Sequence, residues 1–168
     1  AYNLHMFKPG DLIEITRKLH GTSARTSHTK VLKGFKRTLL DIILHRLTPI
    51  AKQQEIELIY ESFRNVIAEV DEVKLSLAIS NLIENAIKYN VEGGWVKVSL
   101  NADHKYFYIR VADSGIGIPQ EEQEHVFDRF YRVDKTRSRE TGGSGLGLAI
   151  VKNIILMHKG SIKLFSRE

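Results

Sequence analysis

The order of helix-like and strand-like segments restricts the fold more than any other feature of this sequence. Residues 95–100 and 106–111 alternate apolar with polar side chains, and the polar turn 101–104 between them predicts an antiparallel hairpin. Amphipathic helices are predicted before and after this hairpin, over residues 37–54, 71–89 and 146–158. Because helices and strands do not alternate as in a Rossmann sheet, we expect an α+β, two-layer sandwich. Its sheet should be mixed and mostly antiparallel, with about three helices on one face.

Shorter segments complete the predicted elements. Strands are predicted over residues 30–35, 55–61, 66–70 and 161–165, and short helices over 11–19 and 121–130. Residues 21–29 and 134–145 are rich in glycine and polar side chains, which predicts loops. Asp71 can cap the helix that follows it, although Lys74 stands where a full capping box has an acid.

Length and composition suit one globular domain. The 168 residues can bury a real core, and no apolar run approaches the roughly 18–20 residues needed to cross a bilayer. The absence of cysteine excludes disulfides and thiolate metal sites. The net charge of +5 comes from residues 1–46, which hold nine Lys or Arg and three Asp or Glu. This segment lacks interleaved aromatic residues, so we interpret it as a solvated or partner-facing surface and expect no nucleic-acid binding.

The helix predicted over residues 71–89 carries a polar stripe on an otherwise apolar surface. Asn81, Glu84, Asn85 and Lys88 are spaced by three, four and seven residues and therefore share one face. One interpretation is a helix with one solvated side. The other is a metal and phosphate face, because an amide oxygen suits Mg²⁺ and a lysine suits phosphate.

A second cluster follows the strand predicted over residues 106–111. In the segment from Asp113 to Pro119, Gly115 and Gly117 let the backbone approach a ligand closely. The carboxylate of Asp113, at a strand end, can accept a hydrogen bond from an exocyclic amine. Taken alone, this segment is equally compatible with an ordinary turn.

Two further clusters lie near the last helix. Phe127 and Phe130 are predicted to be core anchors, whereas Arg132, just beyond them, can reach a phosphate. Residues 142–148, Gly-Gly-Ser-Gly-Leu-Gly-Leu, open the last helix and present backbone N–H groups to an anion. The spacing is that of neither a Walker A loop nor a Rossmann fingerprint.

Together these four clusters resemble the N, G1, F and G2 boxes of the histidine kinase catalytic domain. This domain belongs to a wider family that includes the ATPase domains of gyrase, Hsp90 and MutL and that shares the Bergerat fold. The stretch 127–154, FDRFYRVDKTRSRETGGSGLGLAIVKNI, is similar to the sensor kinases in particular. The resemblance covers residues 36–166 and implies a domain that binds ATP and Mg²⁺.

The resemblance also implies roles for individual residues. Asp113 would bind the adenine amino group, Asn85 would hold Mg²⁺, Lys88 and Arg132 would contact phosphate, and Tyr89 would line the pocket. Segment 134–143 corresponds to the ATP lid. The remaining residues that the resemblance assigns to nucleotide binding are Asn81, Gly115, Gly117, Ile118, Gly143, Ser144, Gly145, Leu146 and Gly147.

Glu84 and His45 each allow two interpretations. Glu84 occupies a position where related ATPases use an acid to activate water, so it either acts in catalysis or orients Asn85 or a metal-bound water. His45, in the segment His45-Arg46-Leu47-Thr48-Pro49, resembles the start of an acceptor-histidine motif. It lacks the acid that follows the acceptor and lies on the first helix of the catalytic domain, so we interpret it as an ordinary helix residue.

The resemblance further implies a division of the chain and a set of partners. Residues 30–168 are predicted to form the catalytic domain, with its last strand truncated. Residues 1–29 are predicted to be the tail of a dimerisation helix or a linker, in part vector-encoded. The fragment is expected to be a cytoplasmic monomer that phosphorylates a histidine on a separate helical hairpin, for relay to a response regulator. The parent protein would then be a homodimeric membrane sensor.

Two alternatives remain open at this point. One is a regulatory module that binds nucleotide without transferring phosphate. The other is a protein-interaction domain whose basic first quarter docks a partner.

Overall fold

The computed structural model describes residues 12–18, 38–63, 66, 68–133 and 143–167. In chain order, the elements are β1 (Leu12–Lys18), α1 (Thr38–Gln53), β2 (Glu57–Ser62), α2 (Glu72–Lys88), β3 (Trp95–Ala102), β4 (Tyr106–Asp113), the 3₁₀ turn η1 (Gln120–Glu122), α4 (Gly147–Met157) and β5 (Ser161–Phe165). The predicted 30–35 strand and 21–29 loop lie outside the described residues.

The five strands of the described residues form one sheet in the order β2-β3-β4-β1-β5. β2 pairs with β3 in parallel, and the other three pairs are antiparallel. The predicted hairpin is present as β3 and β4, with Val98 opposite Val111 in register. The sheet is therefore mixed and mostly antiparallel, as predicted.

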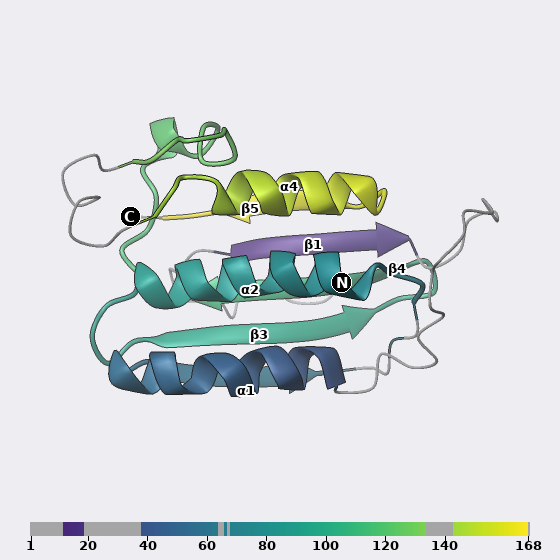
Figure 1. The fold of residues 1–168 in the computed structure, drawn as a ribbon, viewed down its shortest axis with the longest axis horizontal. Helices are drawn as coiled ribbons and strands as arrows, with labels where there is room; N and C mark the ends of the chain where they lie inside the picture. The colour runs from purple at the N-terminus through teal and green to yellow at the C-terminus, as the bar shows by residue number, and fades with distance from the viewer. Residues whose placement is uncertain (1–11, 19–37, 64–65, 67, 134–142, 168) are drawn as a thin grey trace.

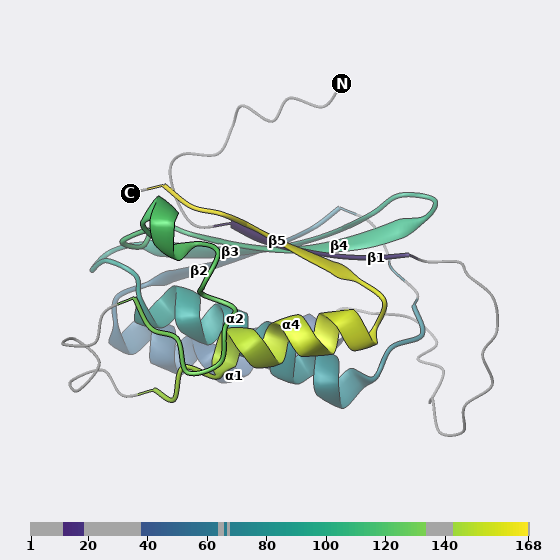
Figure 2. The same ribbon diagram turned by 90° about the horizontal axis from the view of Figure 1, so that it is seen from above.

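The three described α-helices cover one face of this sheet, which makes the predicted two-layer sandwich (Figure 2). α2 lies between α1 and α4 (Figure 1). Its apolar side chains, including Ile79 and Ile83, are buried in one core with Val96 of β3 and Ile109 of β4. Each of these side chains is 0% exposed, so the polar stripe of α2 is left at the edge of the core.

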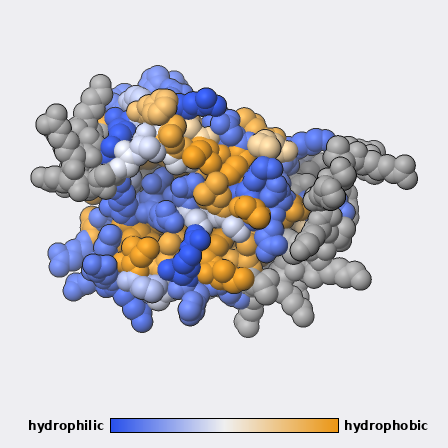
Figure 3. All heavy atoms as spheres, in the orientation of Figure 1, coloured by the Kyte–Doolittle hydropathy of each residue, from blue (hydrophilic) through white to orange (hydrophobic). Residues whose placement is uncertain are grey.

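The outer surface of the helical layer is uneven in character. Seen from the helical side, hydrophobic side chains gather over α1 and α4, with hydrophilic side chains between them (Figure 3). Ile42 on α1 is 63% exposed, and so is Met157 at the end of α4. No described helix is long and apolar enough to cross a membrane.

The short helix predicted over residues 11–19 is wrong, because the backbone there forms β1. Ile13 pairs with Val111 and Ile15 with Ile109 along β4, and β5 pairs with the other edge of β1. The β-branched residues of this segment favour a strand, and its pairing on both edges outweighs the helix-like spacing of its leucine and isoleucine residues. The predicted domain boundary at residue 30 therefore divides the sheet.

The helix predicted over residues 121–130 is also wrong. Only η1 forms there, followed by turns, and Phe130 has a φ of 65°, which a right-handed helix cannot contain. Phe130 is 72% exposed, so its prediction as a core anchor fails, whereas Phe127 is partly buried. In the predicted 66–70 strand, Val66 makes only an isolated bridge, and residues 68–70 are not in a strand.

Candidate functional site

Helix α2 begins at a capping aspartate and carries the polar stripe in its second half. Asp71 caps the helix by accepting the backbone N–H of Lys74 over 3.0 Å, as predicted. Hydrogen bonding to Lys74 holds the pKa of the Asp71 carboxyl below its usual value of 3.8. Further along α2, Asn81 and Asn85 are partly buried, whereas Glu84 is exposed.

The amides of Asn81 and Asn85 lie against the first turn of α4. A Cβ added to Gly147 would lie 3.6 Å from Asn81 Oδ1 and 3.8 Å from Asn85 Nδ2. Asn81 Nδ2 is buried and has no hydrogen-bond partner among the described residues. Buried polar atoms of native proteins almost always have a partner, so this nitrogen marks a place where a ligand or water is expected.

Glu84 lies toward α1 instead. Its Oε1 is 4.0 Å from Arg46 Nη2, and the same Arg46 nitrogen donates to Ser80 Oγ over 2.6 Å. About half of the Glu84 side chain is exposed, at 51%. The stripe thus divides into amides that face α4 and a carboxylate that faces a cation on α1.

Two cations lie beside Gly143 of the glycine-rich segment. Arg132 Nη1 donates to the carbonyl oxygen of Gly143 over 2.6 Å. A Cβ on Gly143 would lie 3.0 Å from Lys88 Nζ and 3.9 Å from Arg132 Nη2. The ammonium of Lys88 is also 5.3 Å from the ring centre of Tyr89. Residues that are far apart in the sequence therefore bring positive charge to one place.

Just before α4, the same segment forms a backbone hydrogen bond with Phe130. Gly145 has a φ of +67°, and its carbonyl accepts the backbone N–H of Phe130 over 2.9 Å. Ser144 is exposed, and Leu146, at the N-cap position of α4, makes no side-chain capping hydrogen bond. The first N–H groups of a helix have no partner within it, so this helix start can bind an anion.

Asp113 ends β4, and the loop that follows it contacts Tyr89 at the C-terminal end of α2. Its side chain is only 8% exposed, and its Oδ1 accepts the N–H of Gly115 over 2.8 Å. The N–H of Ile116 donates to the carbonyl of Tyr89 over 3.1 Å. A Cβ on Gly115 would come within 2.5 Å of that same carbonyl oxygen, so only glycine allows this close approach.

The end of this loop is held by side chains of Ser166 and Gln123. The N–H of Ile118 donates to Ser166 Oγ over 2.7 Å, and Gln123 Nε2 donates to the Ile118 carbonyl over 2.9 Å. Gly117, between these contacts and Asp113, has a φ of +76°. The chain just after β5 thus helps to hold the loop.

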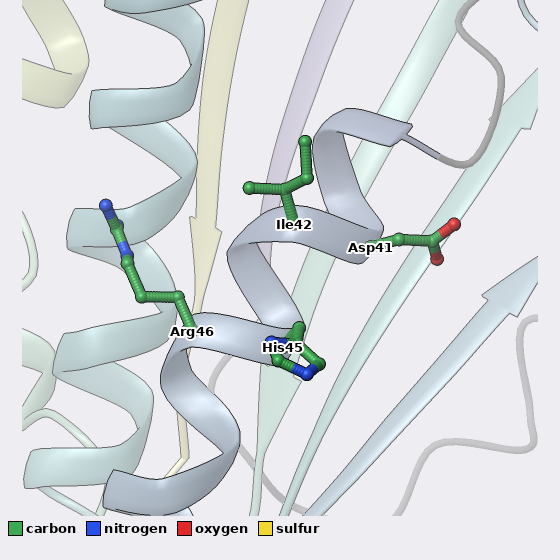
Figure 4. A pocket seen from close by; sticks show the side chains of 4 residues that line it. All are labelled: Asp41, Ile42, His45 and Arg46. Atoms are coloured by element: carbon green, nitrogen blue, oxygen red, sulfur yellow. The ribbon is translucent and has the colours of Figure 1, made fainter.

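His45 lies on α1, apart from the contact between α2 and α4. His45 is exposed on α1, where it lines a depression together with Asp41, Ile42 and Arg46 (Figure 4).

Among the described residues, no group of three or more His, Cys, Asp or Glu side chains can hold a metal. The polar side chains that lie against the first turn of α4 are the amides of Asn81 and Asn85.

Sequence reasoning missed two residues that shape the site. Arg46 accompanies Glu84 from another helix, and nothing in its local pattern signals that contact. Asn90 follows the last turn of α2 and bonds with Ser114 of the Asp113 loop. An asparagine after a helix and before Gly93-Gly94 suggests a turn, and this is the only signal that the sequence offers for it.

The fold and the site define a class of protein. A two-layer sandwich with amides, cations and a glycine-rich helix start at one end of α2 is typical of a nucleotide-binding ATPase domain. The family model described as histidine kinase-, DNA gyrase B-, and HSP90-like ATPase matches residues 70–168.

Individual relatives narrow this class. Sensor histidine kinase WalK of Bacillus subtilis is 44% identical over 126 residues, which are 73% of this chain and 20% of WalK. Sensor-like histidine kinase SenX3 of Mycobacterium tuberculosis is 40% identical over 157 residues, which are 94% of this chain and 37% of SenX3.

Two solved structures agree with these relatives. The mycobacterial sensor histidine kinase MprB is 34% identical, with a TM-score of 0.59, over 73% of this chain and 78% of that chain. Full-length ShkA, solved in complex with AMPPNP, is 26% identical, with a TM-score of 0.60, over 79% of this chain and 27% of that chain.

The chain therefore belongs to the histidine kinase-, DNA gyrase B- and HSP90-like ATPase family, as the ATP-binding catalytic domain of a sensor histidine kinase. It spans between a fifth and two fifths of the length of these two curated relatives.

Proposed function

We propose that this domain binds Mg-ATP and donates the γ-phosphate to a histidine on a separate domain of its parent kinase. One observation carries the proposal: the α2 amides, two cations and the glycine-rich start of α4 converge on the C-terminal half of α2. Within that convergence, Asn81 Nδ2 is buried and has no hydrogen-bond partner in the described part of the chain, as expected of a site built for a ligand. The AMPPNP bound in the ShkA complex supports a nucleotide as this ligand.

The two ends of the site suit the two ends of the nucleotide. Asp113 is buried at a strand end, where its carboxylate can accept a hydrogen bond from the adenine amino group. Lys88 and Arg132 gather beside Gly143, where they can neutralise phosphate charge. The N–H groups at the start of α4 add partial positive charge at the same end.

The donor set also fits a hard divalent cation. Mg²⁺ prefers oxygen ligands and usually keeps several waters, so it needs few protein groups beside the phosphates. Asn85 would supply an amide oxygen to it, with Asn81 beside it on the same face of α2. When bound, Mg²⁺ would neutralise charge on the transferred phosphoryl group. The protein residues act chiefly by positioning, because phosphoryl transfer demands little covalent chemistry from the protein.

For Glu84 we propose an orienting role. Its carboxylate lies 4.0 Å from Arg46 on α1, whereas the neighbouring amides lie against α4. This arrangement supports a residue that shapes the electrostatics around Asn85 more than a base that activates a nucleophile. Conversion of Glu84 to Gln should therefore reduce phosphotransfer far less than conversion of Asn85 to Ala.

We further propose a wider context for this domain in its parent protein. The acceptor histidine would lie on a dimerising helical hairpin, and the phosphoryl group would pass to an aspartate of a response regulator receiver domain. The parent protein would be a homodimeric membrane sensor, with this domain on the cytoplasmic side and monomeric when isolated. We also propose that the domain begins at or before β1, because β1 joins β5 to the sheet.

Phosphotransfer to an added acceptor tests this function. A purified dimerisation hairpin with its acceptor histidine would be incubated with this chain and radiolabelled Mg-ATP. Label should appear on the hairpin and be absent when the acceptor histidine is replaced by Gln. If the chain binds ATP but transfers no label to hairpins from several relatives, a regulatory module that does not transfer phosphate would be favoured instead.

A further inference from the structure

The side chain of Asn90 uses every polar atom it has. Its Nδ2 donates to the carbonyls of Ala86 and Trp95, each over 3.0 Å. Its Oδ1 accepts the N–H of Val91 over 2.9 Å and the hydroxyl of Ser114 over 3.0 Å. One side chain thus joins the end of α2, the start of β3 and the loop that follows β4.

Ser114 completes the connection. Its Oγ accepts the backbone N–H of Trp95 over 2.8 Å, and its own N–H donates to the Trp95 carbonyl over 3.1 Å. The contact is tight, because a Cβ on Gly94 would lie 2.2 Å from Asn90 Oδ1 and 2.6 Å from Ser114 Oγ. We call Asn90, Gly94, Trp95 and Ser114 the Asn90 network.

This network is directly continuous with the base-binding end of the site. Asn90 follows Tyr89, whose carbonyl accepts the N–H of Ile116 over 3.1 Å. Ser114 follows Asp113, whose carboxylate accepts the N–H of Gly115 over 2.8 Å. A shift of either network residue would therefore move the backbone that carries Tyr89 or Asp113.

We infer that Asn90 and Ser114 are positioning residues for recognition of the nucleotide base. They would hold the Asp113 carboxylate at a fixed place relative to Tyr89, so that it meets the amino group of adenine without reorganisation. The inference rests on the nucleotide-binding function proposed above. It assigns discrimination between bases to a polar network that itself touches no nucleotide.

The same hairpin provides a matched control at its other end. In the β3–β4 turn, Asp103 Oδ1 accepts the N–H groups of Lys105 and Tyr106, each over 2.7 Å. Its Oδ2 accepts the hydroxyl of Tyr108 over 2.5 Å. Conversion of Asp103 to Asn therefore perturbs a similar polar network on the same two strands, away from Asp113.

The experiment compares ATP with inosine triphosphate, which has a carbonyl in place of the adenine amino group. Affinities of both nucleotides would be measured by calorimetry with Mg²⁺, for the unmutated chain, Asn90→Ala, Ser114→Ala and Asp103→Asn. Urea unfolding of each variant confirms that it is folded under the binding conditions. Ser114→Ala removes one hydroxyl only, and it carries the test if Asn90→Ala does not fold.

The unmutated chain should prefer ATP about tenfold or more, as expected of a hydrogen bond to a charged group. Asn90→Ala and Ser114→Ala should lower the ATP affinity several-fold to about tenfold and leave inosine triphosphate affinity nearly unchanged, so that the preference falls. Asp103→Asn should leave both affinities unchanged.

Three results would contradict this expectation in distinguishable ways. Failure of the unmutated chain to bind ATP overturns the proposed function, and the inference falls with it. An unmutated chain that prefers ATP, with variants that keep this preference, overturns the inference alone. Equal losses for both nucleotides would mean that the network supports the fold without positioning Asp113, and that result also overturns the inference.

Discussion

Two glycines with nearly the same backbone conformation test how the glycine-rich segment is held. Gly145 has a φ of +67° and Gly93 a φ of +69°, so an alanine at either position enters the left-handed region. That conformation costs an L residue about 1–2 kcal/mol. The surroundings differ: a Cβ on Gly93 meets nothing within 4 Å, whereas one on Gly145 lies 2.8 Å from the carbonyl carbon of Phe130.

The additional cost at Gly145 follows from what its Cβ would touch. The neighbouring atoms belong to the backbone of Phe130 and Tyr131, which cannot turn aside as a side chain can. Overpacking of this kind typically costs about 1–3 kcal/mol. We therefore expect Gly93→Ala to lower the free energy of unfolding by about 1–2 kcal/mol, and Gly145→Ala by about 2–5 kcal/mol.

Urea unfolding at equilibrium measures both values, and calorimetry measures ATP binding by the same samples. If the alanine at position 145 moves away from Phe130 to relieve the strain, the start of α4 moves with it. Gly145→Ala should therefore weaken ATP binding, whereas Gly93→Ala should not. Equal unfolding free energies together with equal ATP affinities for the two variants would refute this reasoning.

Three further predictions concern other contacts. A Cβ on Gly147 would lie 3.6 Å from Asn81 Oδ1, an ordinary contact distance. Gly147→Ala should therefore leave the free energy of unfolding unchanged or raise it by up to about 1 kcal/mol, as measured by urea unfolding. The same variant should bind ATP more weakly, as measured by calorimetry. The pKa of the Asp103 carboxyl is lowered from 3.8 to about 2, chiefly because it accepts a hydrogen bond from the Tyr108 hydroxyl. The contribution of the ionised Asp103 to the stability of the fold should therefore be complete above pH 3.8 and be lost as the pH falls toward 2. Acid unfolding curves check this, since Asp103→Asn should lack that part of the pH dependence. His158 Nε2 accepts the backbone N–H of Asp71 over 3.0 Å, so His158→Ala should lower the free energy of unfolding by about 1 kcal/mol. A His158→Ala variant with unchanged thermal stability would contradict this prediction.

The regular elements could be predicted because their signals are local. The helix predicted over residues 71–89 is present as α2, and the strands predicted over 95–100 and 106–111 are present as β3 and β4. Each combines a clear periodicity with a cap or a turn, and such patterns need no knowledge of distant partners. The fold class followed from their order.

The errors arose where distant contacts decide the structure. β1 has helix-like spacing but lies between two strands whose positions its own residues do not reveal. Phe130 is hydrophobic, yet it has a positive φ, its backbone N–H donates to the Gly145 carbonyl, and the residue is 72% exposed. For the site, helical spacing grouped Glu84 with Asn81, but it could not show that Arg46 lies beside Glu84 on another helix.

Binding of ATP with Mg²⁺ is the most direct test of the central proposal. Calorimetric titration should show binding that falls about tenfold or more in Asp113→Asn, since hydrogen bonds to charged groups contribute about 1.5–3 kcal/mol. In Asn85→Ala, the binding should lose its dependence on Mg²⁺. A folded, unmutated chain that binds neither ATP nor ADP would contradict the proposal. Unchanged affinity in both variants would show that the nucleotide binds elsewhere.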